Sequence, residues 1–228
     1  MARLGIITGL VREAACFDFL PETQRPRVLC EGIGPSRAAD GARKLITEGC
    51  DALISFGIAG GLDPALNPAT IILAEAVLAA DASNRPTDGS WQKRLCRQLE
   101  ATSTVSTGTL FGSDRIIETP ADKRRLFEAT GAVAVDMESH GIAAVAAEAG
   151  VPFLVVRLIS DPATGSIPPA ALKGVGLNGR ERHLAVVGGL LRRPGDLPAL
   201  LRLRRDSMRA VAGLRRVAAL VSPRFGLE

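Results

Sequence analysis

Aromatic side chains make up only 4% of this chain of 228 residues, and tyrosine is absent. Proteins that bind single-stranded nucleic acids stack bases on aromatic side chains, so nucleic acid is a poor candidate partner. No apolar run approaches the roughly 20 residues that a membrane-spanning helix requires. The N-terminal stretch MARLGIITGLVREAACF is too briefly apolar for a secretory signal and predicts a first strand. We therefore expect a cytoplasmic protein.

Residues that bind metals are also few. The four cysteines lie far apart, without the paired spacing of zinc or redox sites, and are expected to be reduced: Cys16, Cys30, Cys50 and Cys96. In the segment AVAVDMESHG, Asp136, Glu138 and His140 alternate along the chain. A metal site here is disfavoured, because a helix that begins after Glu138 turns His140 away and His183 lies in a different context. We expect no metal and no cofactor.

The net charge of +4 is unevenly distributed. Between residues 192 and 228, nine arginines and three acids give +6, so the rest of the chain carries −2. This distribution indicates one basic surface, not a nucleic-acid groove across the fold. We expect residues 1–196 to form the main domain and 197–228 a basic helix.

Residues 197–221 carry an amphipathic pattern. One face holds Leu200, Leu203, Val211, Leu214, Ala218 and Val221, and the other holds Arg202, Arg205, Arg209 and Arg216. Such a helix either packs on the core as part of the same domain or lies on an anionic membrane surface. The sequence leaves both alternatives open, so localisation at the inner face of the membrane is included in the expectation.

Apolar segments of strand length alternate with helical patterns along the chain. The predicted strands are 3–8, 26–31, 52–58, 70–77, 104–111, 132–137 and 153–159, and the predicted helices are 36–48, 90–101, 121–130, 139–149 and 181–192. Strands that are apolar on both faces and separated by helices predict an α/β fold with a largely buried sheet. The long Pro/Gly/Ala-rich loop 162–180 is of the kind that is usually functional or mobile.

Acidic residues follow several predicted strands. Glu13 follows the first strand, Glu138 the sixth and Asp161 the seventh, while the third ends in a cluster of glycines, Gly57, Gly60 and Gly61. Each acid also has a simpler explanation, as a first-turn helix residue or a turn residue before proline. Because ligands bind at the carboxyl ends of strands in open α/β sheets, the combination predicts one shared site.

Arg157 lies within an apolar strand, where an unpaired charge is costly. We therefore expect it to pair with an acid such as Asp136.

Six motifs, in order, resemble those of the purine nucleoside phosphorylase and methylthioadenosine nucleosidase superfamily. They are GIITGLVRE, GIGPSRA, SFGIAGGLDP, GTLFGSDRII, VDMES and VPFLVVRLISD. The later segments SDPATGSIPPAALKGV and LLRRPGDLPALLRLRRD resemble the hopanoid-associated branch, whose members remove adenine from the lipid intermediate adenosylhopane. The resemblance implies a three-layer sandwich in which helices flank a twisted mixed sheet.

The resemblance also implies roles for individual residues. Asp161 would protonate the departing purine, with Ser160 beside it. Glu138 would hold the ribose hydroxyls with Met137 packed on the sugar, and Glu13 would orient or deprotonate a water molecule. The expected substrate-binding set is completed by Ala59, Gly60, Ile116, Ile117 and Arg37.

The same chemistry follows from the residue types. Breaking an N-glycosidic bond builds positive charge on the sugar, which carboxylates stabilise, and negative charge on the base, which an acid neutralises. A partly buried aspartate with a raised pKa suits that proton donor.

Three departures from the family pattern leave the attacking group open. Ile58 replaces a hydroxyl residue, Ile116 replaces a stacking phenylalanine, and the phosphate motif Gly-Asp-Pro-x-Arg is absent. Arg37 or a neighbouring subunit would hold phosphate as a co-substrate, whereas Glu13 favours water.

Two alternatives to an enzyme that cleaves adenosylhopane remain open. One is a nucleosidase or phosphorylase that acts on a soluble nucleoside such as methylthioadenosine, and the other is a non-catalytic nucleotide-binding protein. A homo-oligomer is expected.

Overall fold

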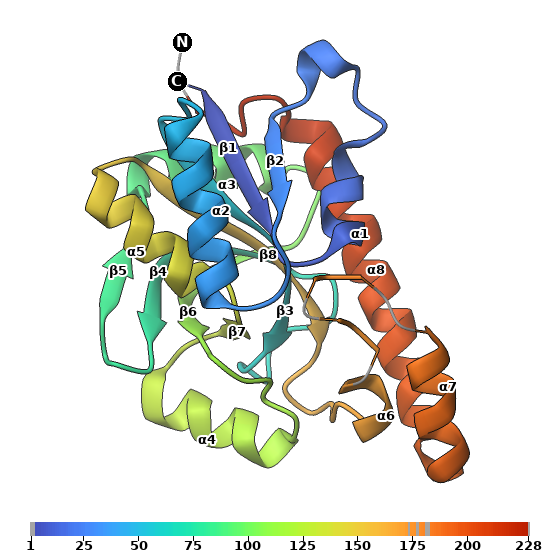
Figure 1. Cartoon of the computed structure of the whole chain (residues 1–228). Helices are drawn as coiled ribbons and strands as arrows, with labels where there is room; N and C mark the ends of the chain where they lie inside the picture. The colour runs from blue at the N-terminus through green and yellow to red at the C-terminus, as the bar shows by residue number, and fades with distance from the viewer. Residues whose placement is uncertain (1–2, 173, 177, 181–182, 228) are drawn as a thin grey trace.

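The computed structural model describes residues 3–172, 174–176, 178–180 and 183–227. Within these residues, eight strands form one mixed sheet that lies between two sets of helices (Figure 1). This arrangement confirms the predicted α/β fold with a central sheet flanked by helices.

The strands are β1 (Leu4–Thr8), β2 (Arg27–Cys30), β3 (Ala52–Gly61), β4 (Ile71–Ala79), β5 (Asn84–Pro86), β6 (Val105–Gly112), β7 (Ala134–Asp136) and β8 (Phe153–Asp161). Every predicted strand is present. β5 was not predicted, because its three residues, Asn-Arg-Pro, carry no apolar signal and form only through pairing with β4.

The sheet order is β2-β1-β3-β7-β6-β4-β5, and β8 pairs with both β3 and β4. β3 runs parallel to β1 and β8, whereas β4 runs antiparallel to β8. The pairings of β3, β7, β6, β4 and β8 therefore close into a ring, which curves this half of the sheet.

The helices are α1 (Val11–Ala14), α2 (Pro35–Thr47), α3 (Gly89–Glu100), α4 (Pro120–Thr130), α5 (Ser139–Ala149), α6 (Pro169–Leu172), α7 (His183–Arg192) and α8 (Leu197–Val221), with short 3-10 turns at Ala15–Phe17, Glu22–Gln24 and Pro194–Asp196. Residues 181–182 of the predicted helix 181–192 lie outside the described residues. α1 and α6 were not predicted, because a single turn is too short to show a helical period.

α4 illustrates how the sequence sets helix ends. The Thr119 side chain accepts the backbone N–H of Asp122 before the first turn, and Pro120 occupies the first position. The helix stops at Gly131, whose left-handed conformation (φ 66°) suits glycine.

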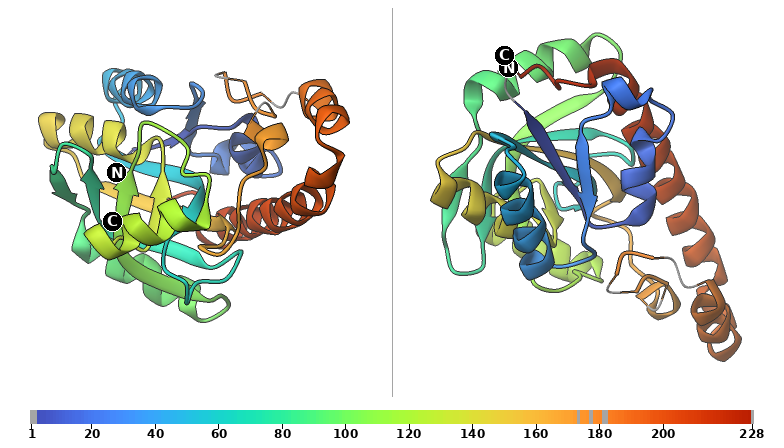
Figure 2. Two further views of the ribbon diagram at one scale, coloured as in Figure 1. Left: turned by 90° about the horizontal axis from the view of Figure 1, so that it is seen from below. Right: turned by 45° about the horizontal axis from the view of Figure 1, so that its top comes forward.

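Two apolar cores lie on opposite faces of the sheet. One core joins β3 and β8 to α2 and α5, and the other joins them to α3 and α8. Successive residues of β3 alternate between the cores, with Leu53 in the first and Ile54 in the second. This alternation explains why the strand sequences are continuously apolar, and it gives the three layers visible in Figure 2.

α8 packs along β8 with its C-terminal two thirds. Its buried residues include Leu214, Val217 and Val221, while the four predicted arginines of the polar face are exposed. The beginning of α8 and the preceding α7 extend beyond the sheet, at the lower right of Figure 1. No helix in the described part of the chain has both the length and the apolar character needed to cross a membrane.

Candidate active site

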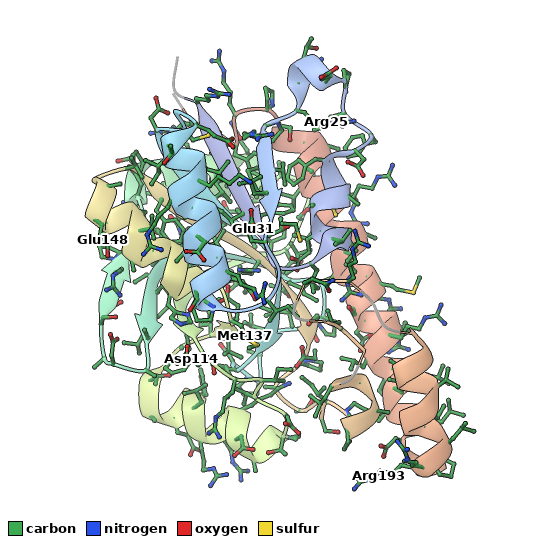
Figure 3. All side chains as sticks on the ribbon, viewed as in Figure 1. Arg25, Glu31, Asp114, Met137, Glu148 and Arg193 are labelled. Carbon is green, nitrogen blue, oxygen red and sulfur yellow. The ribbon has the colours of Figure 1, made fainter. Side chains whose placement is uncertain are left out.

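A cavity of about 270 Å³ lies at the carboxyl ends of β1, β3 and β8, beside the end of β7. Glu13, Glu138 and Asp161 all line it. The other predicted residues in its lining are Ala59, Gly60, Ile116, Ile117, Met137 and Ser160. Figure 3 shows Met137 near the centre of the molecule, where these strands end. The structure thus brings together the predicted site residues with one exception, Arg37, which is exposed on α2 and is not among the lining residues.

Glu13 is fixed by backbone groups from two strand ends. It is buried on α1, and its Oε2 accepts the N–H groups of Gly9 (3.1 Å) and Leu10 (2.9 Å). Its Oε1 accepts the N–H of Ile58 at 2.9 Å. Burial raises the pKa of Glu13, while the charge of Arg157 and these backbone donors act in the opposite direction. The simpler explanation, a solvated acid in a first helical turn, does not hold.

Glu138 lies at the start of α5 and points into the cavity. Its Oε1 accepts the N–H of Gly34 at 3.2 Å, and its Oε2 lies 3.5 Å from Nη2 of Arg157. Burial raises the pKa of Glu138 to about 7, with the neighbouring carboxylates adding to the shift and Arg157 opposing it. With a pKa of about 7, both the protonated and the ionised form of Glu138 are present at neutral pH.

Arg157 pairs with Asp136, as predicted. Nη2 of Arg157 lies 2.5 Å from Oδ2 of Asp136 and donates to Oγ of Ser55 at 2.7 Å. The carboxylate of Asp136 also accepts both the N–H and the hydroxyl of Ser139. The DMES segment thus supplies two acids that line the cavity, of which Asp136 is paired closely with the buried arginine and Glu138 lies farther from it.

Two glycines leave space for this arrangement. A Cβ at Gly57 would lie 2.4 Å from Nη1 of Arg157 and 2.6 Å from Oε1 of Glu13. A Cβ at Gly9 would lie 2.9 Å from Cδ of Glu138. The glycines of TGLVRE and SFGIAGG are therefore needed for the close approach of the acids to the backbone, and not only for turns.

Asp161, the last residue of β8, has a partner that the sequence analysis missed. Its Oδ2 accepts from Nζ of Lys123 at 2.5 Å, and its Oδ1 accepts from Oγ of Ser160 at 2.7 Å. Burial raises the pKa of Asp161, and the charge of Lys123 and the Ser160 hydroxyl oppose that shift. Lys123 shares a helix face with Leu126 and Phe127, and a lysine at such an apolar position was the signal available in the sequence.

His140 turns away from the cavity, as expected from the helix that begins at Ser139. Its Nε2 lies 3.1 Å from Oδ1 of Asp114, on the loop that follows β6. The histidine therefore holds that loop against α5 and does not line the cavity.

The remaining walls come from distant segments. Ile33, Ile58 and Val135 form an apolar part of the lining, Ile167, Ala171, Leu172 and Val175 come from the loop after β8, and Leu203 and Ser207 from α8. The exposed Ile116 (40%) stands at the rim. A small cavity with carboxylates on several sides and apolar walls is typical of enzymes that cleave glycosidic bonds.

The chain belongs to the Phosphorylase superfamily, whose sequence pattern matches residues 16–191. It is 30% identical over 156 residues to a futalosine hydrolase of Streptomyces coelicolor, covering 59% of this chain and 66% of that protein. It is 29% identical over 153 residues to a 5'-methylthioadenosine/S-adenosylhomocysteine nucleosidase of Staphylococcus aureus, covering 59% and 67%. The matches thus span about two thirds of the curated relatives' length.

Solved structures share the fold over nearly the whole chain. The methylthioadenosine nucleosidase of Helicobacter pylori, solved with 5'-methylthioadenosine in its active site, has a TM-score of 0.69 at 16% identity and covers 96% of this chain and 99% of its own. The futalosine hydrolase of the same organism gives a TM-score of 0.68 at 16% identity, with 96% and 97% covered. These similarities show the fold alone, while the curated relatives are nucleosidases and hydrolases, consistent with a nucleoside phosphorylase or nucleosidase.

Proposed function

We propose that this protein is an enzyme that cleaves the N-glycosidic bond of a purine nucleoside, with water as the attacking group. The observation that carries this proposal is the meeting of Glu13, Glu138 and Asp161, each less than 10% exposed, around one cavity. The names of the curated relatives, a hydrolase and a nucleosidase, support the reaction class.

Asp161 is the proposed proton donor. A protonated Asp161 transfers its proton to a nitrogen of the purine imidazole ring, while the electron pair of the breaking C–N bond moves onto the base. Burial raises the pKa of this carboxyl, which favours the protonated form that a proton donor requires. Ile116 and Ile117 line the cavity, where they would contact the base.

Glu138 and Met137 are the proposed contacts of the sugar. As the bond breaks, the ribose gains positive charge, and the carboxylate of Glu138 stabilises that charge while it accepts hydrogen bonds from the hydroxyl groups. Met137, which lies next to Glu138 in the lining, supplies apolar contact to the ribose face.

Glu13 is the proposed general base that deprotonates the attacking water. Oε2 of its carboxylate accepts two backbone N–H groups and Oε1 accepts one, so the remaining lone pair of Oε1 can accept a proton from an attacking water. Phosphate is less favoured than water as the attacking group. Backbone N–H groups that could bind a phosphate, those of Gly9, Leu10 and Ile58, already donate to Glu13. Arg37, the predicted phosphate ligand, is not among the cavity lining. Hydrolysis gives the free base and a ribose with a hydroxyl at C1.

The proposed substrate is adenosine linked to a large apolar group, of which adenosylhopane is the candidate. Its support is a groove of about 820 Å³ that shares Arg12, Ala171, Val175, Leu203 and Ser207 with the cavity. Its own walls are mostly apolar, among them Val186, Leu200, Met208 and Val211. An apolar substituent on the sugar would pass from the cavity into this groove. Methylthioadenosine is the second candidate, since the curated nucleosidase acts on it by name.

Contact with a membrane surface is part of the same proposal. Exposed apolar residues gather along α7 and the first half of α8, namely Val187, Leu191, Leu197, Leu201 and Met208. Arginines accompany them, and Arg193 stands at the far end of α7 in Figure 3. Apolar residues flanked by arginines suit an anionic bilayer.

The membrane contact is tested by flotation with vesicles that contain anionic phospholipid. Deleting residues 197–228 would remove the core residues Leu214 and Val217, so surface variants are preferable. Leu191→Glu with Leu201→Glu should abolish flotation, and Leu220→Glu, at an exposed position near the other end of α8, should not. Flotation unaffected by the first pair contradicts the contact.

The activity is tested by chromatography of the released base. The protein is incubated with adenosylhopane or methylthioadenosine, each with and without inorganic phosphate. We expect adenine release that does not depend on phosphate and is faster with the lipid-linked substrate. A strict requirement for phosphate overturns hydrolysis, and faster release from methylthioadenosine favours the second substrate.

A further inference from the structure

Lys123 is a fully buried lysine at the edge of the site, with a side-chain exposure of 0%. It does not line the cavity itself. Its Nζ donates to Oδ2 of Asp161 (2.5 Å), to the carbonyl of Pro162 (2.9 Å) and to the carbonyl of Gly165 (3.0 Å). An ammonium group has three N–H bonds, so each of them has an acceptor. The side chain is therefore held in one position.

The three acceptors belong to two parts of the site. Asp161 ends β8, and Pro162 and Gly165 begin the loop that continues to Ile167 and Leu172, which line the cavity. α4 thus fixes the proposed acid and the start of a cavity wall through one charge. A buried ammonium without acceptors would be strongly destabilising. The three acceptors around Nζ match the three N–H bonds of a lysine ammonium, so the site is suited to lysine.

Of the two carboxyl oxygens of Asp161, Oδ1 is the one that can give up or take up a proton. Oδ2 is held by Lys123, whereas the hydrogen-bond partner of Oδ1 among the described residues is the hydroxyl of Ser160, at 2.7 Å. That hydroxyl has one hydrogen and a second acceptor, the carbonyl of Ala59 at 3.2 Å. It can donate to Oδ1 when Asp161 is ionised and turn to Ala59 when Oδ1 carries a proton.

We propose that Lys123 is a positioning residue of the reaction, which holds Oδ2 of Asp161 so that the proton passes to the leaving base from Oδ1. This inference rests on the proposed function. In the step, the O–H bond at Oδ1 breaks as the N–H bond of the base forms, and Asp161 becomes a carboxylate. Lys123 keeps all its protons, and its positive charge stabilises the new carboxylate. Solvent returns the proton after the base has left.

Lys123→Met, Lys123→Arg and the control Lys93→Met test the inference. The pH dependence of kcat is the decisive readout. The lysine charge opposes the burial that raises the pKa of Asp161, so its removal raises that pKa further. Because the donor must be protonated, activity should persist to higher pH in Lys123→Met, at a maximal kcat reduced roughly 100-fold. Lys93, exposed on α3, should change neither property.

Lys123→Arg separates position from charge. It keeps the positive charge, so the high-pH limb should stay at the pH of the wild type, but its planar donors do not match the three acceptors and kcat should fall about 10-fold. If kcat of Lys123→Met falls at the same high pH as kcat of the wild type, the inference is overturned. If that variant does not fold, wild-type kcat in Lys123→Arg overturns it.

A failure of the proposed function is recognised separately. If the wild-type protein releases no base from either nucleoside, the proposed function fails. The coupling between the two groups is then measured by ¹³C NMR titration of the Asp161 carboxyl in the wild type and Lys123→Met. A higher pKa without the lysine supports control of this proton by Lys123, and an equal pKa overturns it.

Discussion

Arg157 and Asp136 form an ion pair of 2.5 Å in which each side chain is only 1% exposed. Asp136 lines the cavity, and the same guanidinium is 3.5 Å from Glu138. Arg157, a residue within the sheet, thus carries the charge that balances Asp136, Glu138 and Glu13.

Replacing Arg157 by Met should destabilise the fold by about 3–5 kcal/mol, because it leaves Asp136 buried without its counter-charge. Chemical denaturation at pH 7 measures the change. Arg124, exposed on α4, provides the control, since Arg124→Met should change stability by less than about 0.5 kcal/mol. An Arg157→Met protein as stable as the wild type would show that the pair is dispensable.

Gly57→Ala tests the close approach of Arg157 and Glu13 to the backbone. The added Cβ would lie 2.4 Å from the guanidinium, so the variant should lose about 1–3 kcal/mol of stability and most of its activity. Gly89, at the first turn of α3, has open space around its Cβ position, and Gly89→Ala should fold and function normally. Equal melting temperatures of Gly57→Ala and Gly89→Ala would contradict the predicted clash at Gly57.

Glu138→Gln should be more stable than the wild type at high pH. The pKa of Glu138 is raised from 4.5 to about 7 in the folded state, so folding favours the protonated form. The stability that the protonated Glu138 gives to the fold is therefore fully present below pH 4.5 and is lost as the pH rises to 7. At pH 8 the variant should gain at most about 3 kcal/mol, since one pKa unit corresponds to about 1.4 kcal/mol.

The measurement is thermal unfolding of both proteins at pH 4 and pH 8. The difference should appear only at pH 8, where the variant should also have lost most of its activity. A gain that is the same at both pH values would mean that the protonation of Glu138 is not its cause.

Ala212→Trp tests the groove beside the cavity. Ala212 is exposed on α8 and lines the groove but not the cavity, so an indole there obstructs only an extended apolar substituent. KM for adenosylhopane should rise about 10-fold, equivalent to about 1.4 kcal/mol, with methylthioadenosine unaffected. The control is Ala219→Trp, at an exposed position of the same helix outside the groove. Equal KM values for adenosylhopane in the two variants would exclude the groove as its binding site.

The elements that the sequence predicted well are those with a long local signal. Strands such as 52–58 and 153–159 are continuously apolar because both faces of the sheet are covered. Glu13 and Asp161 follow β1 and β8, which both run parallel to β3, so a shared edge could be predicted for them. Glu138 follows β7, which runs antiparallel to β3. The pairing of Arg157 with an acid followed from the cost of burying a charge. β5, α1 and α6 have no such signal, because each spans only three or four residues.

Other features depend on contacts between distant segments. Lys123 stands in the run Lys-Arg-Arg, which is typical of a solvated helix face, and its place on the face of Leu126 and Phe127 was the only opposing signal in the sequence. Its burial against the end of β8 depends on the packing of α4. The groove depends on how α8 crosses α1 and the loop after β8. A sequence pattern can predict the amphipathic helix but not the surface against which it lies.

The most direct test of the central claim compares base release by the wild type with that of Asp161→Asn and Glu138→Gln, each corrected for its folded fraction. The three carboxylates surround one glycosidic bond in this account, so each variant should lose about 100-fold or more in kcat. Wild-type rates in either folded variant would contradict it.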